Sequence, residues 1–173
     1  MQTEVLDRMP IGIPGQLADL HTAEFGDVMS VTNEEAAAEI PFGVMVKAGT
    51  ADDSAKLLAA NTDKLRGITV FAHNFSKPVQ LGDTGLKPGV TFGLLRKGRI
   101  YVRVEDAVTP ASEVHVRAVA AGLEVKGAFR GTDDGTDTID ITAFAKFICS
   151  ADAGEVAVVE VDMTNASLQV ADS

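Results

Sequence analysis

The sequence predicts an all-β protein: a small β-sandwich or β-barrel domain with an extended N-terminal arm and little helix. Turn residues, mainly glycine and proline, recur roughly every 8 to 15 residues from Pro41 onward. Between them lie short runs rich in valine, isoleucine and phenylalanine, and no long stretch has the 3.6-residue apolar period of a helix. Many short strands separated by turns are typical of sandwiches and barrels.

The chain divides by composition into an arm over residues 1–40, a β-rich core domain over 41–163 and a C-terminal tail over 164–173. In the arm, Met9-Pro10-Ile11-Gly12-Ile13-Pro14-Gly15 holds two prolines and two glycines, so it is extended or turning. Because apolar residues continue through it, we expect the arm to lie on its own domain or on a neighbour. Thr32-Asn33-Glu34-Glu35 has the form of a capping box, but Pro41 follows closely, which leaves a short helix or none.

The core domain is predicted to consist mostly of strands joined by turns. Residues 52–61 are ambiguous between a helical turn and a strand end, and Lys97-Gly98 is predicted to be a tight turn. The expected strands are 42–47, 67–73, 91–95, 99–104, 114–120, 139–148 and 155–162.

One predicted strand alternates cleanly and is the most basic part of the chain. Its core-facing side chains are Ile100, Val102 and Val104, and its other face carries Arg99, Tyr101, Arg103 and Glu105. Glu113, His115 and Arg117 alternate in the same way, so a hairpin between the two runs would place their polar faces side by side. This face is either solvated with internal ion pairs, or a positive patch that steers the protein onto an acidic partner or a copy of itself. Tyrosine and arginine are favoured in interfaces.

Composition excludes several classes of protein. The chain has 25 acidic and 15 basic residues, a net charge of −10, which disfavours binding to nucleic acid and to anionic membranes. A single cysteine forms no internal disulfide, and no apolar run is long enough to span a bilayer. Residues 1–8 lack the features of a signal peptide. We therefore expect a soluble protein made in the cytoplasm.

No motif predicts an enzyme or a cofactor. The phosphate-binding, nucleophile-elbow and zinc-protease patterns are absent, and Cys149 lies in an apolar context typical of an inert thiol. His21, His73 and His115 are too dispersed to predict a zinc site. The carboxylates between Asp133 and Asp140 are a weak candidate for calcium, because their spacing does not match an EF-hand, and a solvated acidic hairpin tip is the preferred interpretation.

An ordered set of segments carries a resemblance to a known family. These segments are Pro10 to Asp19, Ile40-Pro41-Phe42-Gly43-Val44-Met45-Val46 with Gly49-Thr50, Leu65 to Val70, Leu95 to Val102, and Cys149 to Glu160. Together they resemble the structural cement, or head-decoration, proteins of tailed bacteriophages. The resemblance implies a non-enzymatic virion protein without a cofactor. It would be made in the host bacterial cytoplasm, bind the outer surface of the assembled capsid and cement neighbouring major capsid proteins.

The partners implied are the major capsid protein and the protein itself, with a homotrimer favoured over a dimer, and neither nucleic acid nor membrane. The residues expected at the capsid or self interface are Pro10, Ile11, Ile13, Pro14, Leu17, Leu20, Phe25, Arg99, Tyr101 and Arg103. The alternatives are a β-domain associated with the phage tail or fibre and, with less support, a small β-barrel ligand-binding module.

Overall fold

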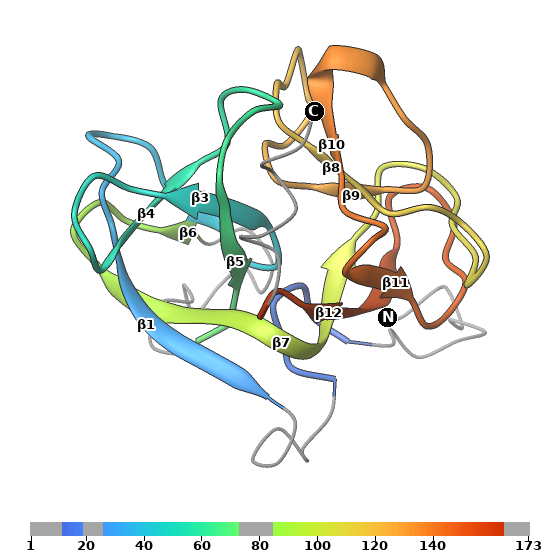
Figure 1. The fold of residues 1–173 in the computed structure, drawn as a ribbon, viewed down its shortest axis with the longest axis horizontal. Coiled ribbons are helices and arrows are strands. Elements are labelled where there is room, and N and C mark those ends of the chain that lie inside the picture. Colours follow the sequence, from blue (N-terminus) through green and yellow to red (C-terminus); the bar gives the residue numbers. More distant parts are fainter. Residues whose placement is uncertain (1–11, 19–25, 73–84, 165–173) are drawn as a thin grey trace, which may run out of the picture.

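The computed structural model describes residues 12–18, 26–72 and 85–164, and within them it is all-β, as predicted (Figure 1). A single 3-10 turn over Gly135–Asp137 is the only helical element of these residues. The strands are β1 Asp27–Asn33, β2 Ile40–Pro41, β3 Met45–Ala48, β4 Ser54–Leu57, β5 Leu65–Thr69, β6 Gly85–Leu86, β7 Thr91–Arg103, β8 His115–Arg117, β9 Phe129–Arg130, β10 Thr138–Asp140, β11 Ala145–Phe147 and β12 Val156–Asp162.

Of the two predicted architectures, the structure has the barrel. Strands β1, β4, β3, β5 and β7 are neighbours in that order, and β1 pairs again with β7 to close the ring. The β1–β4 pair is parallel, with Thr32 opposite Ser54, whereas the other pairs of the ring are antiparallel. The result is a five-stranded mixed barrel, from which β7 continues outward to pair with β12, and β12 with β11.

The long strand β7 joins the two halves of the molecule, as Figure 1 shows. The tight turn predicted at Lys97-Gly98 is wrong, because pairing with β12 runs without a break from Arg103 to Lys97. The β1–β7 register instead shifts by one residue next to Lys97, and Gly98 has a φ of +133°. Such a bulge with a glycine bends a strand without ending it. The bend lies where β7 exchanges its barrel neighbours for β12.

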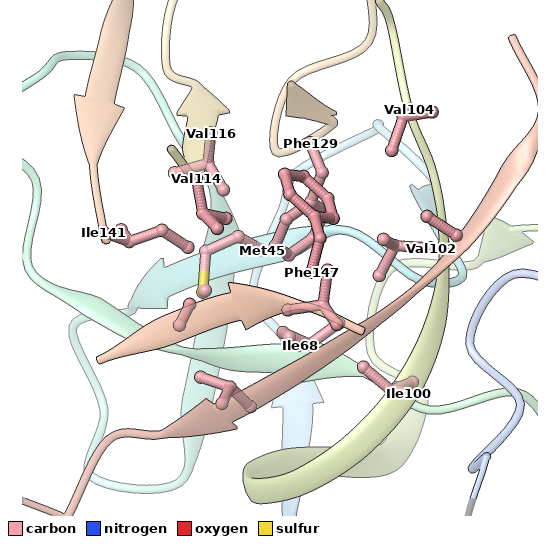
Figure 2. Packing of buried hydrophobic residues seen from close by; sticks show 14 of the residues in the cluster. Met45, Ile68, Ile100, Val102, Val104, Val114, Val116, Phe129, Ile141 and Phe147 are labelled. Atoms are coloured by element: carbon pink, nitrogen blue, oxygen red, sulfur yellow. The ribbon is translucent and has the colours of Figure 1, made fainter. Parts of the chain in front are cut away.

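Two apolar cores lie on opposite sides of the barrel wall. The barrel interior is filled from the ring strands, with the small β2–β6 sheet adding to it, by Val31, Ile40, Val46, Ala55, Leu86, Phe92 and Leu94. The second core packs the other face of β3, β5 and β7 against β8, β9, β11 and β12 (Figure 2). Leu94 and Leu95 are both fully buried because this part of β7 lies between the two cores. The predicted core residues Ile100, Val102 and Val104 belong to the second one.

A three-stranded sheet with β8 at its centre covers this second core. The hairpin considered between residues 99–105 and 113–118 does not form, because β8 pairs with β9 and β10 and not with β7. The strand predicted over 139–148 is divided into β10 and β11. The acidic segment is also not a hairpin tip: it crosses from β9 to β10, which flank β8 on opposite sides.

The possible short helix after Thr32 is absent: Thr32 and Asn33 end β1, and the next two residues bind β4 and the turn before it. The carboxylate of Glu34 accepts hydrogen bonds from the amide of Thr50 and the hydroxyl of Ser54, and Glu35 accepts one from the amide of Leu57. A domain boundary at residue 40 stays a prediction, although residues 27–33 of the expected arm form β1 within the barrel. The tail beyond residue 164 lies outside the described residues.

Candidate functional site

Residues 12–18 of the arm lie along the second half of β7 of their own domain. The amide of Gly15 donates to the carbonyl of Tyr101 over 2.7 Å, and the amide of Tyr101 donates to the carbonyl of Gln16 over 2.9 Å. Leu17 and Ile100 form an antiparallel bridge. The segment therefore adds a short extra strand to β7, the same geometry by which extended peptides bind sheet edges.

Two glycines allow this close approach. A Cβ atom on Gly12 would lie 2.7 Å from the ring of Tyr101, so the arm backbone rests on the face of this ring. Gly15 has a φ of +85°, and a Cβ atom there would lie 2.9 Å from both Phe42 Cβ and the amide of Phe71. That amide donates to the carbonyl of Gly15. The arm is thus fixed to the barrel at Gly15.

Replacing Gly15 with alanine is expected to release the arm while the barrel stays folded. The alanine combines an unfavourable left-handed conformation, which costs about 1–2 kcal/mol, with a steric clash against Phe42 and Phe71. Thermolysin should then cleave before Leu17 faster than in the unchanged protein. Gly89→Ala is the matched control, because Gly89 has a φ of +77° but no neighbour within 4 Å of its Cβ position. Equal cleavage rates in both variants would contradict the docked position of the arm.

The outer face of β7, β12 and β11 carries a ladder of ion pairs. Lys97 pairs with Asp162 at 2.9 Å. Glu160 pairs with two cations, with Arg99 at 2.6 Å through one carboxylate oxygen and with Lys146 at 2.8 Å through the other. Hydrogen bonds from Lys146 and Arg99 lower the pKa of Glu160, and those from Thr164 and Lys97 lower the pKa of Asp162 to about 2. These cations are therefore neutralised within the chain.

Arg103 differs from the other cations of β7. It is exposed at the end of the strand, and it makes no ion pair with any residue that the structure describes. By contrast, Arg96 lies 3.6 Å from Asp27, and Arg99 is paired with Glu160. Arg103 is thus the cation of this strand that is free to meet a partner's charge.

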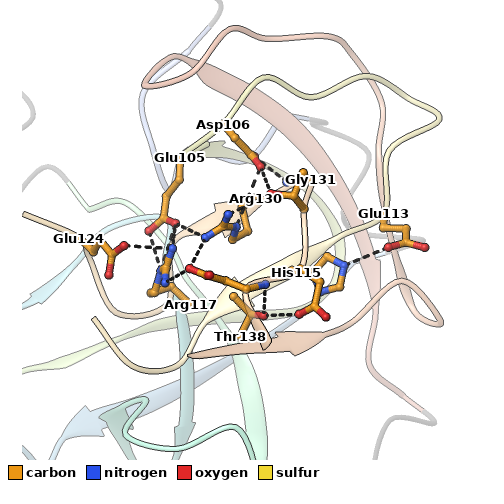
Figure 3. Close-up of polar contacts among 12 residues, drawn as sticks. Glu105, Asp106, Glu113, His115, Arg117, Glu124, Arg130, Gly131 and Thr138 are labelled. Atoms are coloured by element: carbon orange, nitrogen blue, oxygen red, sulfur yellow. Dashed lines mark hydrogen bonds and ion pairs between the residues drawn. The ribbon is translucent and has the colours of Figure 1, made fainter. Parts of the chain in front are cut away.

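A buried arginine organises the polar groups of the small sheet (Figure 3). Arg117 of β8 has 3% of its surface exposed. Its guanidinium donates to Glu105 over 2.8 Å and to Asp134 over 2.7 Å, and it lies 3.2 Å from Glu124. Arg130 of β9 donates to the same Asp134 oxygen over 3.0 Å. The network connects the end of β7, the 118–127 loop and the acidic segment to β8.

These contacts fix the charges of the network. The hydrogen bond to Glu105 raises the pKa of Arg117, and the one from Arg117 lowers the pKa of Asp134. Both groups stay ionised at neutral pH. Neither interpretation of this face as exposed holds for Arg117 and His115, because both are buried. Arg117 still makes the kind of internal ion pair that one interpretation included, with Glu105 and Asp134.

A groove of about 860 Å³ lies between this network and the arm. One part of its lining is apolar, from the arm and the barrel, and includes an edge-to-face pair of Phe42 and Phe71 with ring centres 5.1 Å apart. The other part is charged and comes from the Arg117 network. Residues of the lining are Ile13, Pro14, Glu39, Pro41, Phe42, Gly43, Val44, Phe71, Gly85, Arg103, Val104, Glu105, Asp106, Arg117, Leu123, Glu124, Val125, Ala128, Arg130, Asp134 and Gly154.

Sequence reasoning missed the apolar loop that borders this groove. In residues 118–127, Leu123 is fully exposed (102%) and Val125 is 42% exposed. A loop-like composition between Gly122 and Gly127 was the only available signal, because an apolar residue in a sequence predicts burial more often than exposure.

The structure brings some of the predicted interface residues together and separates others. Ile13, Pro14 and Arg103 line the groove, and Tyr101 lies beneath Gly12. Leu17 packs against the second core, and Arg99 belongs to the ion-pair ladder. The remaining four lie outside the described residues: Pro10, Ile11, Leu20 and Phe25.

Other candidate sites have ordinary structural roles. Asp133 accepts from Thr138, and Asp134 binds two arginines, and no group of three or more potential metal ligands exists among residues 12–18, 26–72 and 85–164. His21 and His73 lie outside the described residues. The half-buried Cys149 accepts a hydrogen bond from the amide of Val158. In the described part of the chain, none of the helices has the length and apolar character needed to cross a membrane.

Comparison with known proteins decides between the remaining interpretations. A family model described as structural cement protein (E217 gp24/Pam3 gp6) matches residues 1–162. The chain belongs to this family of phage structural cement proteins. Its role is therefore structural, non-enzymatic and associated with the capsid, and the protein is a component of the phage virion. No curated protein matches the chain.

Among solved structures, the cement protein shares its fold with a chain from a structure described as the capsid of Myoviridae phage XM1. The TM-score is 0.67 at 17% sequence identity, over 94% of this chain and 97% of that chain. A second match is to the N base of the head fiber gp8.5 in bacteriophage phi29, with a TM-score of 0.41 and 12% identity, over 80% of this chain and 95% of that chain. A TM-score of this size does not establish a shared fold.

Proposed function

We propose that the protein binds the outer surface of the assembled head and cements neighbouring copies of the major capsid protein. Family membership over residues 1–162 carries this proposal. Two features of the structure support it: the arm lies against its own domain by strand addition, and a groove with an apolar part and a charged part opens beside it. Many copies that each use such a modest surface would act together on one particle.

The experiment uses expanded heads of the same phage assembled without the protein. Adding purified protein should raise the temperature at which the heads release DNA, and antibodies against the protein should label intact heads. Labelling only of disrupted heads would overturn the outer location. Labelling confined to tails or fibres would support the alternative of a tail-associated domain. A folded protein that binds no part of the particle would overturn both.

We further propose that the protein acts as a homotrimer rather than a dimer. The support is the resemblance to head-decoration proteins, many of which occupy three-fold or quasi-three-fold positions. Native mass spectrometry and sedimentation velocity of the protein released from heads should give three copies. Two copies would replace this proposal with a two-fold arrangement.

Reversing the charge of Arg103 is expected to weaken head binding. Arg103 is exposed, lines the groove and has no acidic partner in the described chain. With glutamate in its place, an acidic group of the capsid that contacts this position loses an attractive charge and meets a repulsive one. Arg103→Glu should weaken binding about tenfold or more, measured as the concentration that half-saturates heads. Lys87→Glu makes the same charge change at an exposed loop residue outside the groove and should bind normally. Equal affinities of the two variants would exclude Arg103 from the interface.

A further inference from the structure

The 118–127 loop exposes its large apolar residues, while its one acidic residue reaches a buried arginine. Leu123 is 102% exposed and Val125 is 42% exposed, whereas Glu124 between them contacts buried Arg117. The exposed Leu123 side chain contributes nothing to the core. Leu123 and Val125 line the same groove as apolar residues of the arm and the barrel, and an exposed apolar surface of this kind is typical of an interaction site.

The loop is fixed before any partner binds. Glu124 lies 3.2 Å from the Arg117 guanidinium with one oxygen and accepts from the amide of Ala121 over 2.8 Å with the other. At the loop end, the amide of Gly127 donates to the carbonyl of Arg117, and the carbonyl of Gly127 accepts from the amide of Met45. A pre-formed loop loses little conformational entropy on binding, so its apolar side chains contribute more of their burial to affinity.

The groove beside the loop defines the chemistry of the partner. Leu123 and Val125 share its lining with the apolar arm and barrel residues Ile13, Phe42 and Phe71. Its charged part has five carboxylates, Glu39, Glu105, Asp106, Glu124 and Asp134, against the three guanidinium groups of Arg103, Arg117 and Arg130. The lining therefore has two more negative than positive groups. It fits a segment with apolar side chains, a lysine or arginine near these carboxylates, and an acidic group near Arg103.

We propose that this groove holds an extended segment of the major capsid protein, with Leu123 and Val125 as anchors and a basic residue of the segment near the carboxylates. The inference rests on the proposed capsid binding and names the surface of the protein through which it occurs. A capsid segment is favoured over a second copy of the chain because the chain has a net charge of −10, which opposes its own insertion into a groove with a negative excess.

Removing the anchor tests the proposal. Leu123→Ser should weaken binding to undecorated heads about tenfold to a hundredfold, as truncation of an anchor residue does. Its thermal unfolding should be unchanged, because Leu123 contributes no buried surface. Val28→Ser is the matched control: Val28 is 46% exposed but lies on β1, outside the groove, and should bind normally. Normal binding by Leu123→Ser would overturn this inference while leaving the proposed function intact, whereas no binding by the unchanged protein would overturn both.

A crosslink identifies the occupant of the groove. A photoreactive benzoylphenylalanine at position 123 should attach to a peptide of the major capsid protein that contains a lysine or arginine near the attachment point. Half-saturation of heads by the unchanged protein should also require more protein as salt increases, because charge contributes to the contact. A crosslink to a second copy of this chain would show that the groove is a self interface and overturn the assignment to the capsid protein.

Discussion

Replacing Arg117 with methionine is expected to lower the free energy of unfolding by about 3–5 kcal/mol, the usual result of removing one partner from a buried ion pair. Arg117 is 3% exposed and faces Glu105, Glu124 and Asp134. Without its guanidinium, three carboxylates would converge with Arg130 as the only other cation of the network. Urea unfolding followed by circular dichroism measures the loss, and near-complete unfolding would also agree with it.

The ion-pair ladder supplies the control. Arg99 also binds a carboxylate, that of Glu160, but its side chain is 45% exposed, and Glu160 keeps Lys146 as a partner. Arg99→Met should therefore cost less than about 1 kcal/mol, as exposed ion pairs do. Similar small losses in both variants would show that the Arg117 network does not hold the small sheet together.

Deleting residues 2–18 is expected to abolish decoration of heads while leaving a cooperatively folded barrel. The deletion keeps the twelve strands that the structure describes. It removes Ile13 and Pro14, which form the arm wall of the groove, and Leu17, which packs against the second core. Head binding should fall by at least about a hundredfold, because the contributions of several anchor residues are lost together. Co-sedimentation with heads measures the loss, and circular dichroism checks the fold.

The end point of this deletion matters. A deletion to residue 40 would also remove β1, which closes the barrel through β4 and β7, so loss of binding would then report loss of the fold. Deleting residues 165–173 provides a second truncation of the chain and should leave binding unchanged. Normal decoration by the protein that lacks residues 2–18 would show that the arm has no part in cementing.

Local alternation in the sequence predicted strands well where one face of the strand is buried. Ile100 and Val102 are fully buried, and β12 covers nearly the predicted range. Closure of the barrel was beyond prediction, because it depends on a parallel pair between Thr32 and Ser54 that leaves no local pattern. The same limit applies to Leu94 and Leu95, whose burial requires a core on each side of β7.

Errors arose where distant residues changed the meaning of a local signal. Gly98 looks like a turn residue, but pairing of β7 with β12 continues through it. Arg117 has the polar alternation of an exposed face, but Glu105 and Asp134 reach it from other segments and make its burial possible. Covered charges of this kind are visible only in three dimensions.

The candidate site was partly predictable. Ile13, Pro14 and Arg103 were expected in an interface, and the structure places all three on one groove. The exposure of Leu123 was not expected, because it depends on a contact between distant residues. Glu124 reaches inward to Arg117, and the side chain of Leu123 next to it is left in solvent. The sequence shows which residues can bind a partner, but not which of them the fold leaves exposed.

The most direct test of the account is co-sedimentation of the purified protein with expanded, undecorated heads of its own phage, with the bound copies counted per head. Capsid cementing predicts saturable binding, with a number of copies per head that matches one class of symmetry positions on the shell. This number identifies the symmetry axis that the protein occupies. The absence of binding by a protein shown to be folded, or binding that increases without saturation, would contradict it.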